Sequence, residues 1–119
     1  MKNFRELKVW EKGHSLTLAI YKATASFPNE ERYGLTSQIR RSSVSVPANI
    51  AEGCGRGSDA ELARFLQIAA GSASELEYHL LLASQLDMLN VPDHKHLTKE
   101  VTEVKRMLTS FIKKLEADS

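Results

Sequence analysis

Apolar residues recur at a helical period along four stretches of this 119-residue chain, and this pattern constrains the fold more than any other feature. Spacings of three and four residues place side chains on one face of an α-helix. The stretch 35–54 shows the pattern with Leu35, Ile39, Val46 and Ile50. No stretch reads as a β-strand. The sequence therefore predicts an all-α protein.

The four predicted helices cover about residues 4–26, 35–54, 58–86 and 92–115. Phe27 ends the first, because a residue before proline is pushed out of the helical region. Ser58-Asp59-Ala60-Glu61 has the form of a capping box, in which Ser58 caps the third helix and Glu61 reaches back. Short connections between amphipathic helices favour an antiparallel up-and-down four-helix bundle, and we expect a single domain over residues 1–119.

The second predicted helix contains Pro47. Proline cannot donate to the carbonyl four residues back, at Ser43, so a kink is expected there. Nearby serine hydroxyls are expected to satisfy part of the freed backbone. Gly53 and Gly55 are expected to end this helix, because glycine readily adopts the left-handed conformation of a C-terminal cap.

A polar stripe on the same helix is the first candidate for a functional surface. Its members alternate four and three residues apart: Gln38, Ser42, Ser45, Asn49, Glu52 and Arg56. Arg40 and Arg41 lie beside it. Ordinary solvated faces are richer in lysine and glutamate. We therefore expect the stripe to touch a neighbouring helix, a second subunit or a phosphate backbone.

Arginine is the only positively charged residue between Lys22 and Lys95. The five arginines of this interval are Arg32, Arg40, Arg41, Arg56 and Arg64. The planar guanidinium suits bidentate pairing with carboxylate or phosphate. Two interpretations stay open: pairing within the chain to Glu30, Glu31, Glu52 and Glu61, or an anion-binding site.

The third predicted helix carries a heptad seam and more apolar surface than one core can bury. The seam consists of Leu62, Phe65, Ala69, Ser72, Leu76, His79, Ala83 and Leu86. The run Leu80-Leu81-Leu82 spans too wide an arc to face a single core. A second buried face on one helix of a small protein predicts self-association.

The sequence gives little evidence of catalytic or metal-binding motifs. There is no CxxC, no His-Glu-x-x-His and no glycine-flanked serine nucleophile. Gly53 to Gly57 follows a helix rather than a strand, so we interpret it as a tight turn. Cys54 is expected to be a small buried or capping thiol, and His79 a packed histidine. We expect no catalytic residue, no metal site and no cofactor.

The composition of the chain indicates the cellular compartment in which it works. The net charge is +1, which argues against a chain that is basic all over. The single cysteine excludes an internal disulfide framework and fits a reducing cytoplasm. No apolar run approaches the length of a membrane span. We therefore expect a cytoplasmic protein without a membrane partner.

Several blocks over nearly the whole chain together identify a family resemblance. The blocks are Phe27-Pro28, Glu31-Arg32-Tyr33-Gly34-Leu35, Gln38-Ile39-Arg40-Arg41, Ser45-Val46-Pro47-Ala48-Asn49-Ile50-Ala51-Glu52-Gly53, Arg64-Phe65-Leu66, Gly71-Ser72 and Glu75-Leu76-Glu77. In this order and spacing the chain resembles the bacterial four-helix bundle proteins, also called intervening-sequence proteins of the large ribosomal RNA.

The resemblance implies a bacterial, cytoplasmic protein with no established enzymatic activity. Some members are encoded within insertions in large-subunit ribosomal RNA genes. The family is similar in fold to accessory variability proteins of diversity-generating retroelements, which form five-subunit barrels, bind nucleic acid and engage a reverse transcriptase. Those proteins are basic, whereas this chain is close to neutral. The residues here that match the family pattern are Arg40, Arg41, Asn49, Glu52, Gly53 and Arg64.

Two functions from different classes stay open. One is a homo-oligomeric RNA- or DNA-binding or reverse-transcriptase accessory protein, in which copies of the arginines gather around an axis. The other is a structural or protein-interaction scaffold without nucleic-acid binding, in which the arginines pair with carboxylates across a subunit interface. The candidate residues for either surface are Arg40, Arg41, Asn49, Glu52, Arg56 and Arg64.

Overall fold

Four long helices, joined by short connections, make up the computed structural model, which describes residues 2–118. The elements are the 3-10 turn η1 (Phe4–Glu6), α1 (Lys8–Thr24), the 3-10 turn η2 (Asn29–Glu31), α2 (Leu35–Cys54), α3 (Asp59–Gln85) and α4 (Val91–Ala117). No strand occurs within residues 2–118. The predicted all-α class is confirmed.

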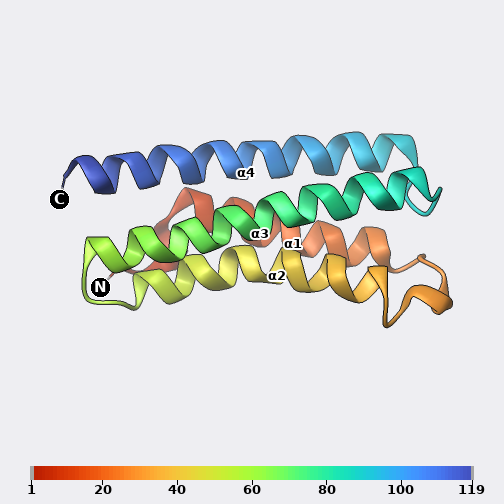
Figure 1. Cartoon of the computed structure of the whole chain (residues 1–119), viewed down its shortest axis with the longest axis horizontal. Coiled ribbons are helices and arrows are strands. Elements are labelled where there is room, and N and C mark those ends of the chain that lie inside the picture. The colour runs from red at the N-terminus through yellow and green to blue at the C-terminus, as the bar shows by residue number, and fades with distance from the viewer. Residues whose placement is uncertain (1, 119) are drawn as a thin grey trace.

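The helices lie side by side along the 46 Å length of the molecule, and successive helices run in opposite directions (Figure 1). Each helix packs against the next one in the chain, and α4 returns to pack against α1. The diagonal pairs do not approach each other among the described residues. This arrangement is the antiparallel up-and-down four-helix bundle that the sequence predicts.

The core is built mainly from the predicted apolar stripes. Ile39, Val46 and Ile50 of α2 are completely buried, and Val101, Val104 and Leu108 of α4 are completely buried in the same hydrophobic cluster. Burying a branched aliphatic side chain contributes roughly 1.5–3 kcal/mol. These stripes therefore set which face of each helix turns inward.

The heptad seam predicted for α3 is correct for five of its eight members. Leu62, Phe65, Ala69, Leu76 and Ala83 are buried, but Ser72 and His79 are partly exposed and Leu86 is 54% exposed. A straight helix has 3.6 residues per turn, so a strict seven-residue repeat drifts by about 20° per heptad. The line that begins at Phe65 consequently drifts towards α2, and its place in the core is taken by Leu66, Ala73 and Leu80.

Pro47 lies inside α2, which continues as one helix from Leu35 to Cys54. The Ser43 carbonyl, which proline leaves without a helical partner, accepts a hydrogen bond from Thr17 Oγ1 of α1 at 2.9 Å. The expectation that neighbouring serines would do this is wrong, because Ser43 Oγ donates to the Arg40 carbonyl. The kink itself stays a prediction.

The predicted left-handed glycine cap of α2 is also wrong. Gly55 has φ −80°, and its N–H donates to the carbonyls of Ala51 and Glu52. Gly53 is still helical and is buried where α2 meets α3. A Cβ at this position would lie 2.9 Å from both Leu62 Cδ1 and Phe65 Cβ. Close approach of the two helices, rather than backbone conformation, therefore requires the glycine.

The caps of the other helices follow the sequence more closely. Ser58 Oγ accepts from the Glu61 N–H, so Ser58 is the N-cap of α3 as predicted. The reciprocal bond from Glu61 is replaced by pairing of its carboxylate with Arg64. Asn90 caps α4, whose first turn contains Pro92 as expected.

Candidate interaction surface on α2 and α3

The polar stripe of α2 faces α3 within the same chain. Ser45 Oγ and Ser72 Oγ are 2.8 Å apart, and the Asn49 side-chain amide donates to the Ser45 carbonyl at 2.8 Å. Ser42 is completely buried, and its hydroxyl lies 3.4 Å from His79 Nδ1. Of the three neighbours expected for this stripe, the adjacent helix is confirmed.

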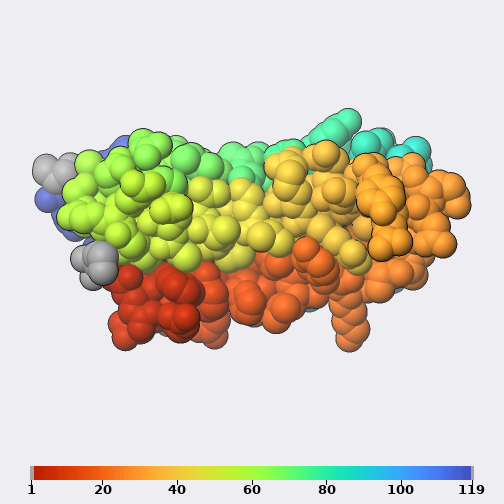
Figure 2. Space-filling model, turned by 90° about the horizontal axis from the view of Figure 1, so that it is seen from below, coloured from red at the N-terminus to blue at the C-terminus, as the bar shows by residue number. Residues whose placement is uncertain are grey.

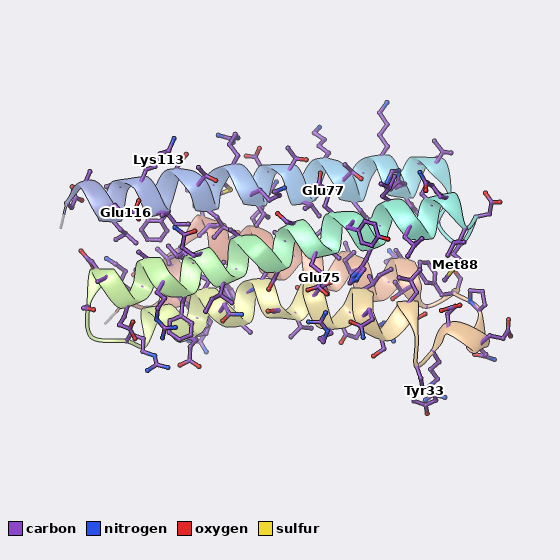
Figure 3. The ribbon with its side chains drawn as sticks, in the orientation of Figure 1. Tyr33, Glu75, Glu77, Met88, Lys113 and Glu116 are labelled. Carbon is purple, nitrogen blue, oxygen red and sulfur yellow. The ribbon has the colours of Figure 1, made fainter. Side chains whose placement is uncertain are left out.

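Arg41 joins α2 to α3 at the outer edge of this contact. Its guanidinium forms an ion pair with Glu75 of α3 and also donates to Gln38 Oε1 at 3.0 and 3.1 Å. Glu75 lies on the side of α3 that faces α2, whereas Glu77 points towards α4 (Figure 3), where it pairs with Lys105 at 2.8 Å. The two carboxylates diverge, as their spacing predicts.

Arg56 and Arg64 flank the turn between α2 and α3. Arg56 pairs with Glu52 at 3.4 Å and Arg64 with Glu61 at 2.9 Å. Both guanidinium groups also lie over the Phe65 ring, at 4.8 and 4.5 Å from its centroid. The hydrogen bond from Arg64 lowers the pKa of Glu61. Pairing with Glu52 and Glu61 agrees with the in-chain interpretation.

Arg40 is different, because it lies on the side of α2 that faces α1. Its Nε donates to Thr24 Oγ1 at 2.8 Å, and its guanidinium lies 4.7 Å from the centroid of the Tyr21 ring. Within residues 2–118 it has no ion-pair partner. Figure 2 shows α2 between α1 and α3. Arg40 contacts α1 on one side of α2, and Arg41 contacts α3 on the other side.

The structure thus divides the six candidate residues into two groups. Arg41, Asn49, Glu52, Arg56 and Arg64 lie along the contact between α2 and α3, and Arg40 lies apart from them. Three of the four candidate arginines carry a carboxylate partner in their own chain. Exposed pairs of this type are worth about 0–1 kcal/mol, so they can exchange partners at little cost.

His79 and Cys54 are packed side chains. Burial is the largest effect on His79 and lowers its pKa, while the Glu75 carboxylate acts in the opposite direction and Arg41 adds to the lowering. Burial raises the pKa of the Cys54 thiol, which is 2% exposed. The neutral forms are favoured in both cases. These surroundings agree with the predicted packed histidine and buried thiol.

Four apolar or aromatic side chains of α3 and its C-cap residue are exposed. They are Ile68, Tyr78, Leu81 and Leu86, with exposed fractions of 41%, 58%, 45% and 54%. Ile68 is four residues before Ser72, and Leu86 is seven after His79, so both extend the line of α3 that contacts α2. Leu80 of the run 80–82 is buried and Leu81 is exposed, so the run does span more than the core-facing arc, as predicted. We call Arg41, Asn49, Ser72, Glu75, Ile68 and Leu86 the α2–α3 face.

No helix in residues 2–118 is long and apolar enough to span a membrane. The same residues contain no cluster of three or more histidine, cysteine, aspartate or glutamate side chains placed to hold a metal ion.

Comparison with known proteins identifies a family and solved structures of similar fold. The sequence model of the 23S rRNA-intervening sequence protein family matches residues 5–110. The crystal structure of a protein of unknown function, from the S23 ribosomal protein family of Bacteroides thetaiotaomicron, is similar with a TM-score of 0.79 and 29% identity. The similarity covers 88% of this chain and 98% of that one. No curated protein matches the sequence.

Proposed function

We propose, from the premise that this chain belongs to the 23S rRNA-intervening sequence protein family, that it is a self-associating, non-enzymatic scaffold of the bacterial cytoplasm. Its α2–α3 face is the surface through which copies meet. The resemblance to five-subunit barrels makes a pentamer the expected assembly. The assembled bundle presents surfaces for a protein partner and has no catalytic role.

The observation that carries this proposal is the pairing of Arg41, Arg56 and Arg64 with carboxylates of the same chain. A surface with equal numbers of both charges attracts phosphate weakly, whereas it can pair with a second copy of itself by exchanging partners. Ile68 and Leu86 add exposed apolar area beside these pairs. Apolar side chains among alternating charges are typical of an interface core with a polar rim.

Light scattering of the wild-type protein and of two variants tests the proposal. The wild type should have several times the 13.3 kDa mass of one chain. Ile68→Glu places a charge in the α2–α3 face and should reduce the mass to that of a monomer. Leu18→Glu is the matched control, because Leu18 is 59% exposed on α1 and lies outside that face. A monomeric wild type, or an Ile68→Glu variant that keeps the oligomer mass, would contradict the proposal.

A second candidate function is favoured by Arg40, which has no carboxylate partner in residues 2–118. In this alternative the oligomer binds RNA or DNA and acts as an accessory to a reverse transcriptase. Repetition of Arg40 by symmetry would strengthen a weak charge. Adding a mixed pool of short RNA to the same light-scattering experiment separates the two functions. A mass gain that is lost with salt would favour nucleic-acid binding, and no gain would favour the scaffold.

A further inference from the structure

A pocket of about 260 Å³ opens at the end of the bundle where α1 ends and α2 begins. The last turn of α1, the turn around Pro28 and the first turns of α2 line it. Its polar side chains are Thr24, Asn29, Arg32, Thr36 and Arg40, and the described residues that line it include no acidic side chain. The pocket is therefore positively charged, although the protein as a whole is close to neutral.

Thr36 supplies a hydroxyl group that lacks a partner. The residue is 6% exposed, and its Oγ1 is the one buried side-chain nitrogen or oxygen atom in residues 2–118 that forms no hydrogen bond. Buried polar groups are almost always hydrogen-bonded, so each exception needs an explanation. A ligand oxygen in the pocket would complete the hydrogen bonding of this hydroxyl.

Arg40 has guanidinium N–H groups that lack a hydrogen-bond acceptor in the described structure. Nε donates to Thr24 Oγ1 at 2.8 Å and one Nη donates weakly to the Tyr21 carbonyl at 3.5 Å. A guanidinium has five N–H donors, so most of them remain for another acceptor. These contacts, together with the Tyr21 ring, hold the group in place at the pocket wall.

Arg32 adds a second guanidinium without a carboxylate partner in the described chain. Its group lies 5.6 Å from the centroid of the Tyr33 ring, and Tyr33 projects outward from this end of the molecule (Figure 3). The neighbouring Glu31 is not among the residues that line the pocket, and one of its carboxylate oxygens accepts from the Leu35 N–H at 3.0 Å. No described carboxylate in the pocket lining competes with an incoming anion.

We propose that this pocket is a binding site for a phosphate group. The guanidinium groups of Arg40 and Arg32 pair with the phosphate oxygens, and the Thr36 hydroxyl donates to one of them. Planar guanidinium groups match phosphate geometry, and hydrogen bonds to charged oxygens are the strong ones. The site goes beyond self-association: it is on the α1 side of α2, away from the α2–α3 face.

Titration of the full-length protein with inorganic phosphate at constant ionic strength, followed by amide NMR shifts, tests the site. The wild type should show saturable shifts around Thr36 and Arg40. Thr36→Val removes a hydroxyl that has no partner in the fold, so it should fold normally and bind phosphate roughly tenfold more weakly. Arg40→Gln should weaken binding at least as much. Thr102→Val and Arg106→Gln, both on α4, are the matched controls and should bind as the wild type does.

Saturation at the same concentration in the wild type and in Thr36→Val, or shifts that rise linearly without saturation, would overturn the proposal. A second arm identifies the source of the phosphate by using a short RNA with a 5′-phosphate and the same RNA with a 5′-hydroxyl. Tighter binding of the 5′-phosphorylated form would assign the site to a nucleic-acid end, and equal binding of both would exclude such an end as the source of the phosphate. Because oligomer mass is not the readout, failure here leaves the proposed scaffold function standing.

Discussion

Thr17 Oγ1 donates to the Ser43 carbonyl at 2.9 Å, and that carbonyl is the one that Pro47 leaves without a helical N–H partner. The donor comes from α1 and the acceptor from α2, 26 residues apart. A side chain of one helix thus completes the backbone hydrogen bonding of its neighbour.

Thr17→Val should therefore destabilise the fold. The substitution removes the donor and leaves a buried carbonyl without a partner, which costs about 1–3 kcal/mol of unfolding free energy. Urea unfolding followed by circular dichroism measures the loss. Thr102→Val is the control, because that exposed hydroxyl only bonds to the Thr98 carbonyl of its own helix, and its change should stay within about 0.5 kcal/mol.

The same contact predicts an energetic coupling between Thr17 and Pro47. Pro47→Ala supplies an N–H that can donate to the Ser43 carbonyl, so Thr17→Val should cost less in that background than in the wild type. A double-mutant cycle measures the difference as the interaction energy of the two positions. Equal costs of Thr17→Val in both backgrounds would show that the hydroxyl does not replace the missing helical bond.

Gly53→Ala should destabilise the bundle by forcing α2 and α3 apart. The new Cβ would lie 2.9 Å from Phe65 Cβ and from Leu62 Cδ1, and overpacking of this kind costs about 1–3 kcal/mol. Gly57→Ala is the matched control, because no atom lies within 4 Å of a Cβ there. Its unfolding free energy should differ little from the wild type. Equal stability of the two variants would disprove the close-contact explanation for Gly53.

The sequence could predict the parts of this structure that depend on neighbours along the chain. Such features involve residues at most four positions apart. They are the helical period, the Ser58 cap and the pairs Arg56–Glu52 and Arg64–Glu61. The sequence alone could not predict which side chains of different helices contact each other. The partner of Arg41 is 34 residues away, so its identification needs the register of α3 against α2.

A small angular error explains the part of the predicted heptad seam that failed. A strict heptad drifts by about 20° at each repeat, so Phe65, Ser72, His79 and Leu86 pass from the core to the α2 contact and then to the surface. The drift also explains why Leu86, a member of the predicted seam, is exposed. The polar pocket at Thr36 could not be predicted from the sequence. Its walls come from α1, from the turn around Pro28 and from α2, and only their arrangement in space leaves the Thr36 hydroxyl without a partner.

His79 should make the bundle less stable as the pH falls. Burial lowers its pKa below the usual value of about 6.5, so the unfolded chain takes up the proton more readily than the folded one. Its full contribution is present above the unfolded pKa and is lost as the pH falls through the lower folded pKa. Thermal unfolding at about pH 7.5 and about pH 5.5 measures the loss. His79→Gln should reduce it, whereas His96→Gln, at an exposed position on α4, should not.

The Arg41–Glu75 pair gives the most direct test of whether copies meet at the α2–α3 face. The side chains of Arg41 and Glu75 are 54% and 38% exposed, so breaking the pair within one chain should change monomer stability by less than about 1 kcal/mol. If the pair also exchanges partners between copies, Arg41→Glu and Glu75→Arg should each lower the oligomer mass, because like charges then face each other at every contact. The double swap should restore it. Sedimentation of the three variants decides: unchanged mass in both single variants would place the interface elsewhere on the bundle.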